Sequence, residues 1–149
     1  MVTIKVQRIT ESAKLPTKAH DSDACYDLYL DAPQTGEVGV MLFPHETIKM
    51  PSGIKTEIPK GYFAAVFPRS GLGINKNIVL ANGTGITDCD YRGEWVIALT
   101  NNSNFTWTLK HGDRVAQFAI LPVIESTLVE TDELSDTERG EGGLGSTGN

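Results

Sequence analysis

The sequence predicts an all-β protein, built as a sandwich, a barrel or a jelly roll. Short runs of alternating or β-branched residues recur along the chain, and its 15 glycines and 7 prolines separate these runs every few residues. A sustained 3.6-residue hydrophobic period, which packed helices require, is missing from the sequence. A helical bundle is therefore excluded.

Ten segments have the length and alternation expected of strands. In chain order they are residues 3–9, 40–43, 47–50, 54–58, 62–67, 78–80, 95–100, 106–109, 115–120 and 123–129. The one helix that we expect is a single turn after Ser70, whose hydroxyl is suited to cap it.

The composition changes near residue 130. Residues 131–141 are polar and acidic, and residues 140–149 include five glycines. Such a stretch buries too little apolar surface to become ordered by itself. We therefore expect a β domain over residues 1–130 and a flexible, Gly-rich C-terminal arm over residues 131–149.

The length and the cysteine content restrict the class of protein. A chain of 149 residues suits one domain with a sizeable core. No apolar run approaches the roughly 20 residues of a membrane span, and the N-terminus does not resemble a signal peptide. Cys25 and Cys89 are too few for a disulfide scaffold and lack zinc-site spacing, so reduced thiols in the cytoplasm are favoured over a disulfide.

The charge is concentrated near the C-terminus. The formal net charge is −6, and residues 125–141 hold seven acids and one base, Arg139, so the rest of the chain is neutral. Stable binding to nucleic acid through a broad basic face is therefore not expected. A small anionic ligand remains compatible with these charges, because one pocket needs only a few cations.

A first polar segment follows the apolar run 62–67. Arg69, Ser70 and Gly71 supply a guanidinium, a hydroxyl and a flexible backbone at a strand end, which suits a phosphate site. An ordinary Pro/Gly turn with a solvated Arg69 is the alternative.

A second polar segment covers residues 82–94. Asn82-Gly83 indicates a hairpin between the run 78–80 and the run that begins at Trp95. Strand alternation predicts Asp88 and Asp90 on one face, with Cys89 and Tyr91 on the other. A carboxylate there suits a general base and an aromatic ring suits stacking on a sugar or base, although a polar hairpin with a buried tyrosine fits equally well.

Three weaker segments complete the survey. Near residue 113 we expect an Asp113–Arg114 ion pair at a turn, with Gln117 able to face a ligand. The tail resembles a phosphate cradle but lacks the Lys and the helix of a P-loop, so a linker stays open. The acids at 21, 23 and 27 lack the glycine and glutamate of an EF-hand, which favours solvated turn acids over a direct metal cage.

In this order and spacing, the segments resemble the homotrimeric dUTPase (deoxyuridine 5′-triphosphate nucleotidohydrolase) family over residues 19–149. The resemblance implies a jelly-roll-like β-barrel, a homotrimer with shared active sites and an arm that closes each site. It also implies a dUTP diphosphatase acting on a phosphoric anhydride. Water would attack the α-phosphorus of dUTP to give dUMP and pyrophosphate, which limits uracil incorporation into DNA and supplies dUMP for dTMP synthesis.

The resemblance also assigns roles to residues. Asp88 corresponds to the catalytic carboxylate, and Mg²⁺ would sit on the phosphates with Asp27 reaching it through water. The uracil and deoxyribose would contact Asn82, Gly85, Ile86, Thr87 and Tyr91. The phosphates would contact Arg69, Ser70, Gly71, Gln117, Arg139, Gly145, Ser146 and Thr147.

Three positions depart from the family pattern without removing a catalytic group. Leu144 replaces the usual arm aromatic and would only cover the uracil, Cys25 replaces a glycine, and Thr87 replaces an aliphatic residue. Two alternatives follow. A dCTP deaminase shares the fold and would use Glu94 as its acid–base group, and a nucleotide-sensing protein would keep the pocket and signal through its arm. The ligands expected of the chain are dUTP and Mg²⁺.

Overall fold

A computed structural model describes residues 1–143 of the chain. Its helices are α1 (Ser70–Lys76) and the short 3-10 helix η1 (Pro33–Thr35). Its strands are β1 (Lys5–Arg8), β2 (Tyr26–Tyr29), β3 (Val40–Leu42), β4 (Thr47–Pro51), β5 (Ile54–Glu57), β6 (Tyr62–Phe67), β7 (Ile78–Leu80), β8 (Gly85–Thr87), β9 (Val96–Asn101), β10 (Trp107–Leu109) and β11 (Arg114–Pro122). The all-β prediction is confirmed. None of the helices among these residues is long and apolar enough to cross a membrane.

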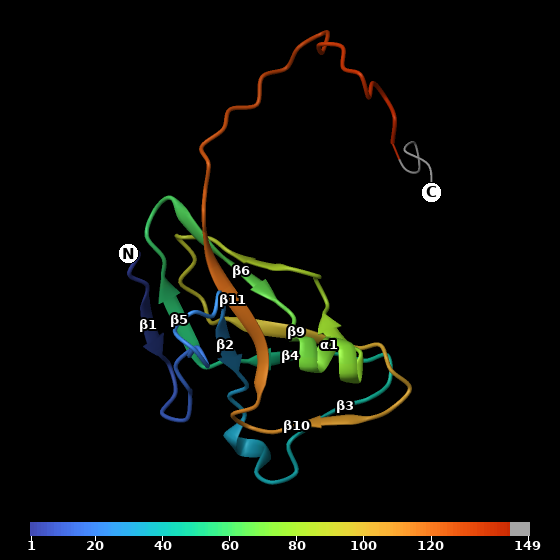
Figure 1. Ribbon diagram of the computed structural model, residues 1–149. Helices are drawn as coiled ribbons and strands as arrows, with labels where there is room; N and C mark the ends of the chain where they lie inside the picture. The colour runs from blue at the N-terminus through green and yellow to red at the C-terminus, as the bar shows by residue number, and fades with distance from the viewer. Residues whose placement is uncertain (144–149) are drawn as a thin grey trace.

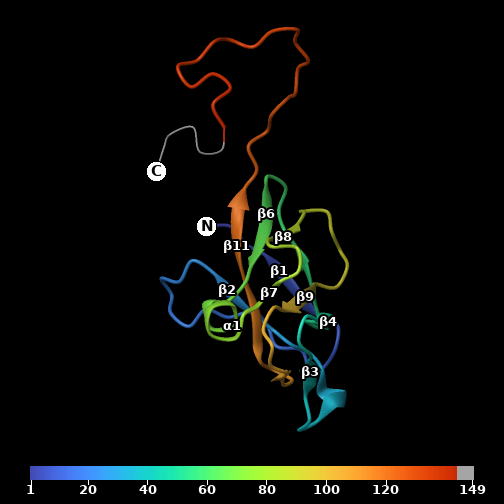
Figure 2. The same ribbon diagram turned by 90° about the vertical axis from the view of Figure 1, so that its right-hand side faces the viewer.

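The strands form antiparallel sheets that join segments far apart in the sequence (Figures 1 and 2). The four-stranded sheet has the order β2-β11-β6-β8, and the three-stranded sheet has the order β4-β9-β7. Two strand pairs, β1-β5 and β10-β3, complete the fold. In the largest sheet β6 lies between β11 and β8, so its two edges carry different parts of the chain.

Alternation along the strands builds one hydrophobic core. In β5, for example, Ile54 and Thr56 are buried while Glu57 is exposed. The ring of Trp95 meets Phe118 edge-on, with 4.9 Å between the ring centroids. Each fully buried Leu or Ile side chain contributes about 1.5–3 kcal/mol relative to exposure, so these faces decide which way each strand lies.

Two strands and the form of the helix differ from the expectations. β2 and β8 were not expected as strands, because β2 buries only Leu28 fully and β8 has no fully buried residue. The helix runs for seven residues rather than one turn. Ser70 is its first helical residue and Arg69 is the N-cap, without a side-chain cap bond, so the predicted Ser70 cap is wrong.

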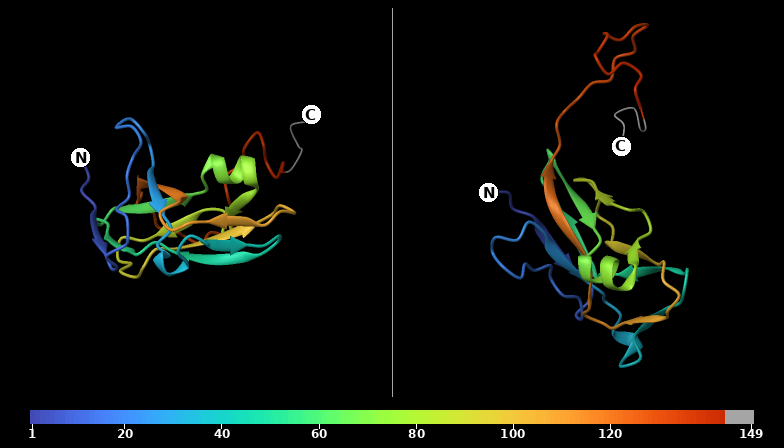
Figure 3. Two further views of the ribbon diagram at one scale, coloured as in Figure 1. Left: turned by 90° about the horizontal axis from the view of Figure 1, so that it is seen from below. Right: turned by 45° about the vertical axis from the view of Figure 1, so that its right-hand side comes forward.

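The chain leaves the barrel after β11. A strand over residues 123–129 was expected, but β11 ends at Pro122, which pairs with Tyr62, the first residue of β6. Because β6 begins at Tyr62, residue 123 has no strand residue to pair with, and its N–H donates to the carbonyl of Gly61 in the turn before β6 (2.8 Å). The predicted strand over residues 123–129 is therefore wrong. Residues 126–141 are all exposed and run away from the sheets, as Figure 1 and the right-hand view of Figure 3 show.

Asn101 is a fully buried polar side chain on β9, and it ties three segments together. Its amide donates to the carbonyls of Leu42 (3.0 Å) and Phe105 (2.7 Å), and its oxygen accepts from the backbone and hydroxyl of Ser103. Since a lost buried hydrogen-bond partner costs about 1–3 kcal/mol, we predict that Asn101→Ala lowers the free energy of unfolding by about 3 kcal/mol in urea denaturation. Asn102→Ala, at an exposed neighbour, is the matched control. Equal stability of the two variants would contradict the prediction.

Candidate active site

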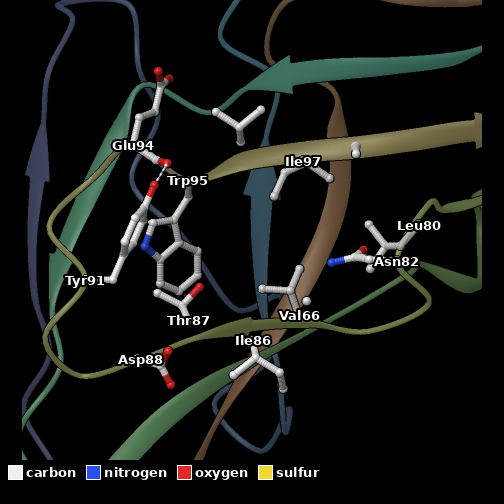
Figure 4. Close-up of a pocket in the computed structure, with 13 residues that line it drawn as sticks. Val66, Leu80, Asn82, Ile86, Thr87, Asp88, Tyr91, Glu94, Trp95 and Ile97 are labelled. Carbon is white, nitrogen blue, oxygen red and sulfur yellow. Dashed lines mark hydrogen bonds between the residues drawn. The ribbon is translucent and has the colours of Figure 1, made fainter.

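A cavity of about 270 Å³ opens beside β8 (Figure 4). All six residues expected at the catalytic group, the uracil and the deoxyribose line it: Asn82, Gly85, Ile86, Thr87, Asp88 and Tyr91. Val66, Leu80 and Ile97 supply an apolar inner wall. The lining therefore combines two acidic residues, Asp88 and Glu94, and two aromatic residues, Tyr91 and Trp95, with an apolar wall, which suits a planar ligand with a polar rim.

A tight turn and a close strand contact shape one side of the cavity. Gly83 has a φ of +69° and its N–H donates to the carbonyl of Leu80 (3.0 Å), which makes the turn predicted from Asn82-Gly83. β7 pairs with β9 as the hairpin prediction requires, but β8 crosses over to pair with β6. Gly85 lies opposite Val66 there, where an added Cβ would be 3.1 Å from the Val66 Cβ.

Asp88 and Tyr91 line the same cavity, which corrects the prediction that they lie on opposite faces. The chain turns immediately after β8, and the N–H of Tyr91 donates to the carbonyl of Asp88 (3.2 Å). Strand alternation does not continue through such a turn. Both side chains are exposed, while Cys89 between them packs against the core.

Trp95 is a residue of this cavity that the sequence reasoning did not identify. Its ring is buried, and its indole Nε1 has no hydrogen-bond partner among the described residues. Figure 4 shows the ring between Tyr91 and the apolar wall, above Thr87. The sequence did show a large aromatic residue at the start of the expected strand over residues 95–100. It did not show which way the ring of Trp95 points.

A second group of expected residues meets at Asp27, in another cavity. The Nε of Arg69 lies 2.8 Å from Oδ1 of Asp27, and Nη1 of Arg114 lies 3.2 Å from Oδ2. The Asp27 side chain is only 12% exposed. Gln117 lines the same cavity and its amide donates to the carbonyl of Pro68 (3.0 Å). Two guanidinium groups therefore meet in this cavity and can grip an anion, while Asp23 and Asp27, which also line it, balance their formal charge.

A β-bulge explains why Arg114 was missed. Arg114 was expected to pair with Asp113, but that carboxylate instead accepts from the N–H of Lys110 (2.8 Å). The register of β11 against β2 shifts between Arg114 and Ala116. In a regular strand, residues 114 and 117 would face opposite sides, and the extra residue of the bulge lets both line the Asp27 cavity.

Among the described residues, Ser70, Gly71 and Arg139 line neither cavity. Ser70 and Gly71 begin α1 directly after Arg69. Arg139 lies on the exposed segment after β11, where its Nε donates to the carbonyl of Gly142 (2.8 Å). Leu144, Gly145, Ser146 and Thr147 lie outside the described residues.

The Asp27 cavity suits a magnesium ion only indirectly. Within residues 1–143, no three His, Cys, Asp or Glu side chains are grouped closely enough to hold a metal ion. Each oxygen of Asp27 already faces a guanidinium, so a dehydrated cation would have to displace an arginine. The donor set fits an ion held by ligand phosphates and water, with Asp27 accepting from a coordinated water.

The two cavities lie apart in one protomer. Thr87, which precedes Asp88, pairs with Ala64, while Arg69 lies five residues further along β6 and its extension. At ~3.4 Å per residue, these five residues separate the level of Thr87 from that of Arg69 by about 17 Å along the strand. Figure 2 shows β8 well above α1, and the residues lining the two cavities do not overlap.

Comparison with protein families now gives these cavities a context. The family model described as dUTPase matches residues 11–148. The chain belongs to the dUTPase family. A deoxyuridine 5′-triphosphate nucleotidohydrolase of Alkaliphilus metalliredigens is 40% identical over 148 residues and 99% of each chain. One from Syntrophotalea carbinolica is 42% identical, covering 99% of this chain and 97% of that protein.

Solved dUTPase structures have the same fold. A mutant dUTPase of Staphylococcus bacteriophage 80alpha with dUpNHpp is similar with a TM-score of 0.86, 26% identity and 99% coverage of both chains. A mutant dUTPase of phage phi11 of S. aureus, described with a coordinated structural Mg(II) ion, has a TM-score of 0.76 at 25% identity, covering 88% of this chain and 97% of that one. The predicted jelly-roll-like β fold of the dUTPases is confirmed.

The thiol of Cys25 lies in the Asp27 cavity. Burial raises the pKa of Cys25 above its ordinary value; Lys18 lowers it, and Asp27 and Asp23 raise it further. The reactive thiolate is therefore scarce near neutral pH, and we predict that iodoacetamide alkylates Cys25 more slowly than a free cysteine at about pH 8.

The rate should increase as the pH rises above the ordinary cysteine pKa, and mass spectrometry of the modified peptide measures it directly. Cys25→Ser is the control that isolates the reaction of Cys89. A Cys25 rate equal to or above that of free cysteine at that pH would contradict the prediction.

Proposed function

We propose that the chain is a dUTP diphosphatase that hydrolyses dUTP to dUMP and pyrophosphate, with Asp88 positioning the attacking water. The observation that carries this proposal is the joint presence of Asp88 and Tyr91 in one cavity of a dUTPase-family fold. The product dUMP is a precursor for dTMP, and removal of dUTP limits uracil incorporation into DNA. The two free cysteines are compatible with a cytoplasmic enzyme, in the host cytoplasm if the protein is viral.

The uracil and deoxyribose belong in the cavity beside β8. Asn82 and the backbone of Gly85, Ile86 and Thr87 offer polar groups at its edge, where a hydrogen-bond mismatch with another base would cost about 1–3 kcal/mol. The ring of Tyr91 would pack under the sugar and exclude a 2′-hydroxyl. Asp88 would accept the proton of a water whose oxygen attacks the α-phosphorus, while the bond from that phosphorus to the pyrophosphate oxygen breaks.

The phosphates belong to the groups around Asp27. Arg69 and Gln117 are half-buried and meet there, and the backbone of Ser70 and Gly71 follows directly. Arg114 adds a second guanidinium that we now include. Mg²⁺ bound to the phosphates would neutralise charge on the leaving pyrophosphate, while Asp27 would orient one of its waters.

We further propose a homotrimer in which two protomers complete each active site. The separation of about 17 Å along the strand between Thr87, which precedes Asp88, and Arg69 supports this. A neighbouring protomer that brings its own Asp27 group to this protomer's Asp88 would close the gap. The exposed segment after β11 would then continue as the arm over residues 131–149, and Arg139, Leu144, Gly145, Ser146 and Thr147 would cover the nucleotide as a lid.

The two alternatives explain the site less well. A dCTP deaminase would need a free carboxylate at the base, but Glu94 accepts the N–H of Gly53 (2.8 Å) and Figure 4 shows its carboxylate directed away from the cavity. A purely sensing protein has no need of an exposed carboxylate at the cavity, which Asp88 provides.

Asp88→Asn tests the catalytic assignment. The amide keeps the shape and hydrogen bonding of the side chain but cannot take a proton, so kcat should fall by about 10²–10⁴ while dUTP still binds. Pyrophosphate release from dUTP with Mg²⁺ measures this, with dCTP, dTTP, UTP and EDTA as comparisons. Asp90→Asn, on the same turn but outside the cavity, should stay near wild type. An unchanged kcat in Asp88→Asn would refute the assignment.

Mixing two inactive variants tests the shared site. Arg69→Ala and Asp88→Asn should each be inactive, but in mixed trimers some sites pair the intact Asp88 of one protomer with the intact Arg69 of its neighbour. Random assembly of equal amounts restores about a quarter of the sites in a closed ring. Refolding the mixture and assaying pyrophosphate release measures this. No recovery in a mixture shown by mass spectrometry to contain mixed trimers would exclude sharing.

A further inference from the structure

Glu94 is a half-buried acid that the proposed mechanism leaves without a role. It follows the turn that carries Asp88 and Tyr91, and its two ends hold different parts of the structure. Its backbone carbonyl accepts the hydroxyl of Tyr91 (3.0 Å), and its carboxylate accepts the N–H of Gly53 (2.8 Å). Figure 4 shows these two ends pointing in different directions, with only the carbonyl facing Tyr91.

The Gly53 end is a firmly placed anchor. Gly53 has a φ of +66°, and an added Cβ would lie 2.4 Å from Oδ2 of Asp31 and 2.6 Å from the Ala13 Cβ. Its carbonyl also accepts the N–H of Ile9 (2.8 Å). The Gly53 backbone is thus closely surrounded and hydrogen-bonded through both its N–H and its carbonyl, so the Glu94 carboxylate has a well-defined partner.

The backbone on both sides of Glu94 is attached to the same turn. The N–H of Trp95 donates to the carbonyl of Ile54 (3.0 Å), and the hydroxyl of Ser52 donates to the carbonyl of Trp95. Three consecutive residues, 52 to 54, therefore hold residues 94 and 95 in place. The Glu94 carbonyl that receives the Tyr91 hydroxyl is positioned by these contacts.

The Tyr91 ring closes the arrangement from the other side. It lies against Gly93, where an added Cβ would be 2.2 Å from the Tyr91 hydroxyl oxygen and 2.4 Å from Cζ. The ring position thus depends on a missing side chain at 93 and on a fixed acceptor at 94. Tyr91 itself is 47% exposed, so the packing around its ring gives it little other restraint.

We propose that Glu94 is a positioning residue for Tyr91, and that its bond to Gly53 sets the nucleotide's deoxyribose selectivity. This inference rests on the proposed function, in which the Tyr91 ring excludes a 2′-hydroxyl. Without the Glu94–Gly53 bond the backbone at 94 loosens, the Tyr91 ring gains freedom, and a ribose fits more easily. The effect is on discrimination between dUTP and UTP rather than on the chemical step.

The test compares Glu94→Met with Glu94→Gln. Methionine has a similar length and no oxygen acceptor, while the glutamine amide oxygen still accepts the Gly53 N–H. We expect Glu94→Met to lower the ratio of kcat/KM for dUTP to kcat/KM for UTP by about tenfold, and Glu94→Gln to keep it near wild type. A ratio in Glu94→Met equal to that of wild type would overturn the proposal.

Two further variants separate positioning from general destabilisation. Glu46 makes the same kind of bond far from the cavity, since its carboxylate accepts the Phe43 N–H (2.9 Å), so Glu46→Met should change stability without changing the ratio. Tyr91→Phe removes the hydroxyl, and Glu94→Met should then have a smaller effect in the double mutant than alone. Additive effects, or an equal loss of the ratio in Glu46→Met, would refute a path through Tyr91.

Gly93→Ala keeps the test decisive if Glu94→Met fails to fold. The φ of Gly93 lies outside the left-handed range, so alanine adds no backbone strain there, but its Cβ would collide with the Tyr91 ring. The ratio of kcat/KM for dUTP to kcat/KM for UTP should therefore fall again. The affinities for dUMP and UMP, measured by calorimetry, report discrimination between deoxyribose and ribose without any hydrolysis. If the wild-type protein binds dUMP selectively but does not hydrolyse dUTP, the proposed function is refuted. The role of Glu94 is then judged by whether Glu94→Met lowers the preference for dUMP over UMP. Failure to bind either nucleotide would overturn both.

Discussion

The pairing of β6 with β11 on one edge and with β8 on the other decides where the site residues lie. The β8 edge places Gly85 against Val66 and so builds the cavity of Asp88 and Tyr91. The β11 edge places Gln117 opposite Phe67, and two residues later the chain reaches Arg69. One strand thus supports the cavity of Asp88 at one edge and the Asp27 cavity at its end. Their separation follows from strand geometry, and it is the observation on which the proposed homotrimer rests.

Asp27 has a structural role in its cavity in addition to the proposed one at the metal. Its carboxylate is mostly buried between Arg69 and Arg114, and hydrogen bonds to charged groups contribute about 1.5–3 kcal/mol each when well formed. Removing the carboxylate would leave two guanidinium groups facing each other. The same pairing fixes the direction of Arg69 before any phosphate arrives, so less side-chain entropy is lost on binding.

The parts of the site that could be predicted from sequence are those that one short segment supplies. Asn82 to Tyr91 lie in one segment, and the resemblance to the dUTPase family assigned them to one site, although strand alternation wrongly placed Asp88 and Tyr91 on opposite faces. The grouping of Arg114 with Asp27 was not predictable, because it depends on a bulge in β11 and on the register of β11 against β2. β2 and β8 were also not expected from the sequence. Only one residue of β2 and none of β8 is fully buried, so the alternation of apolar and polar residues that marks a strand is weak in both.

The contacts that hold Tyr91 in place are made largely to backbone groups. The Tyr91 hydroxyl bonds a backbone carbonyl, the Glu94 carboxylate bonds a backbone N–H, and Gly93 contributes only the absence of a Cβ. Contacts of this kind depend on the path of the chain more than on which polar side chain makes them. Under the proposed role of Glu94, selectivity would depend on residues that fix this backbone, including Gly53 and Gly93, which do not line the cavity.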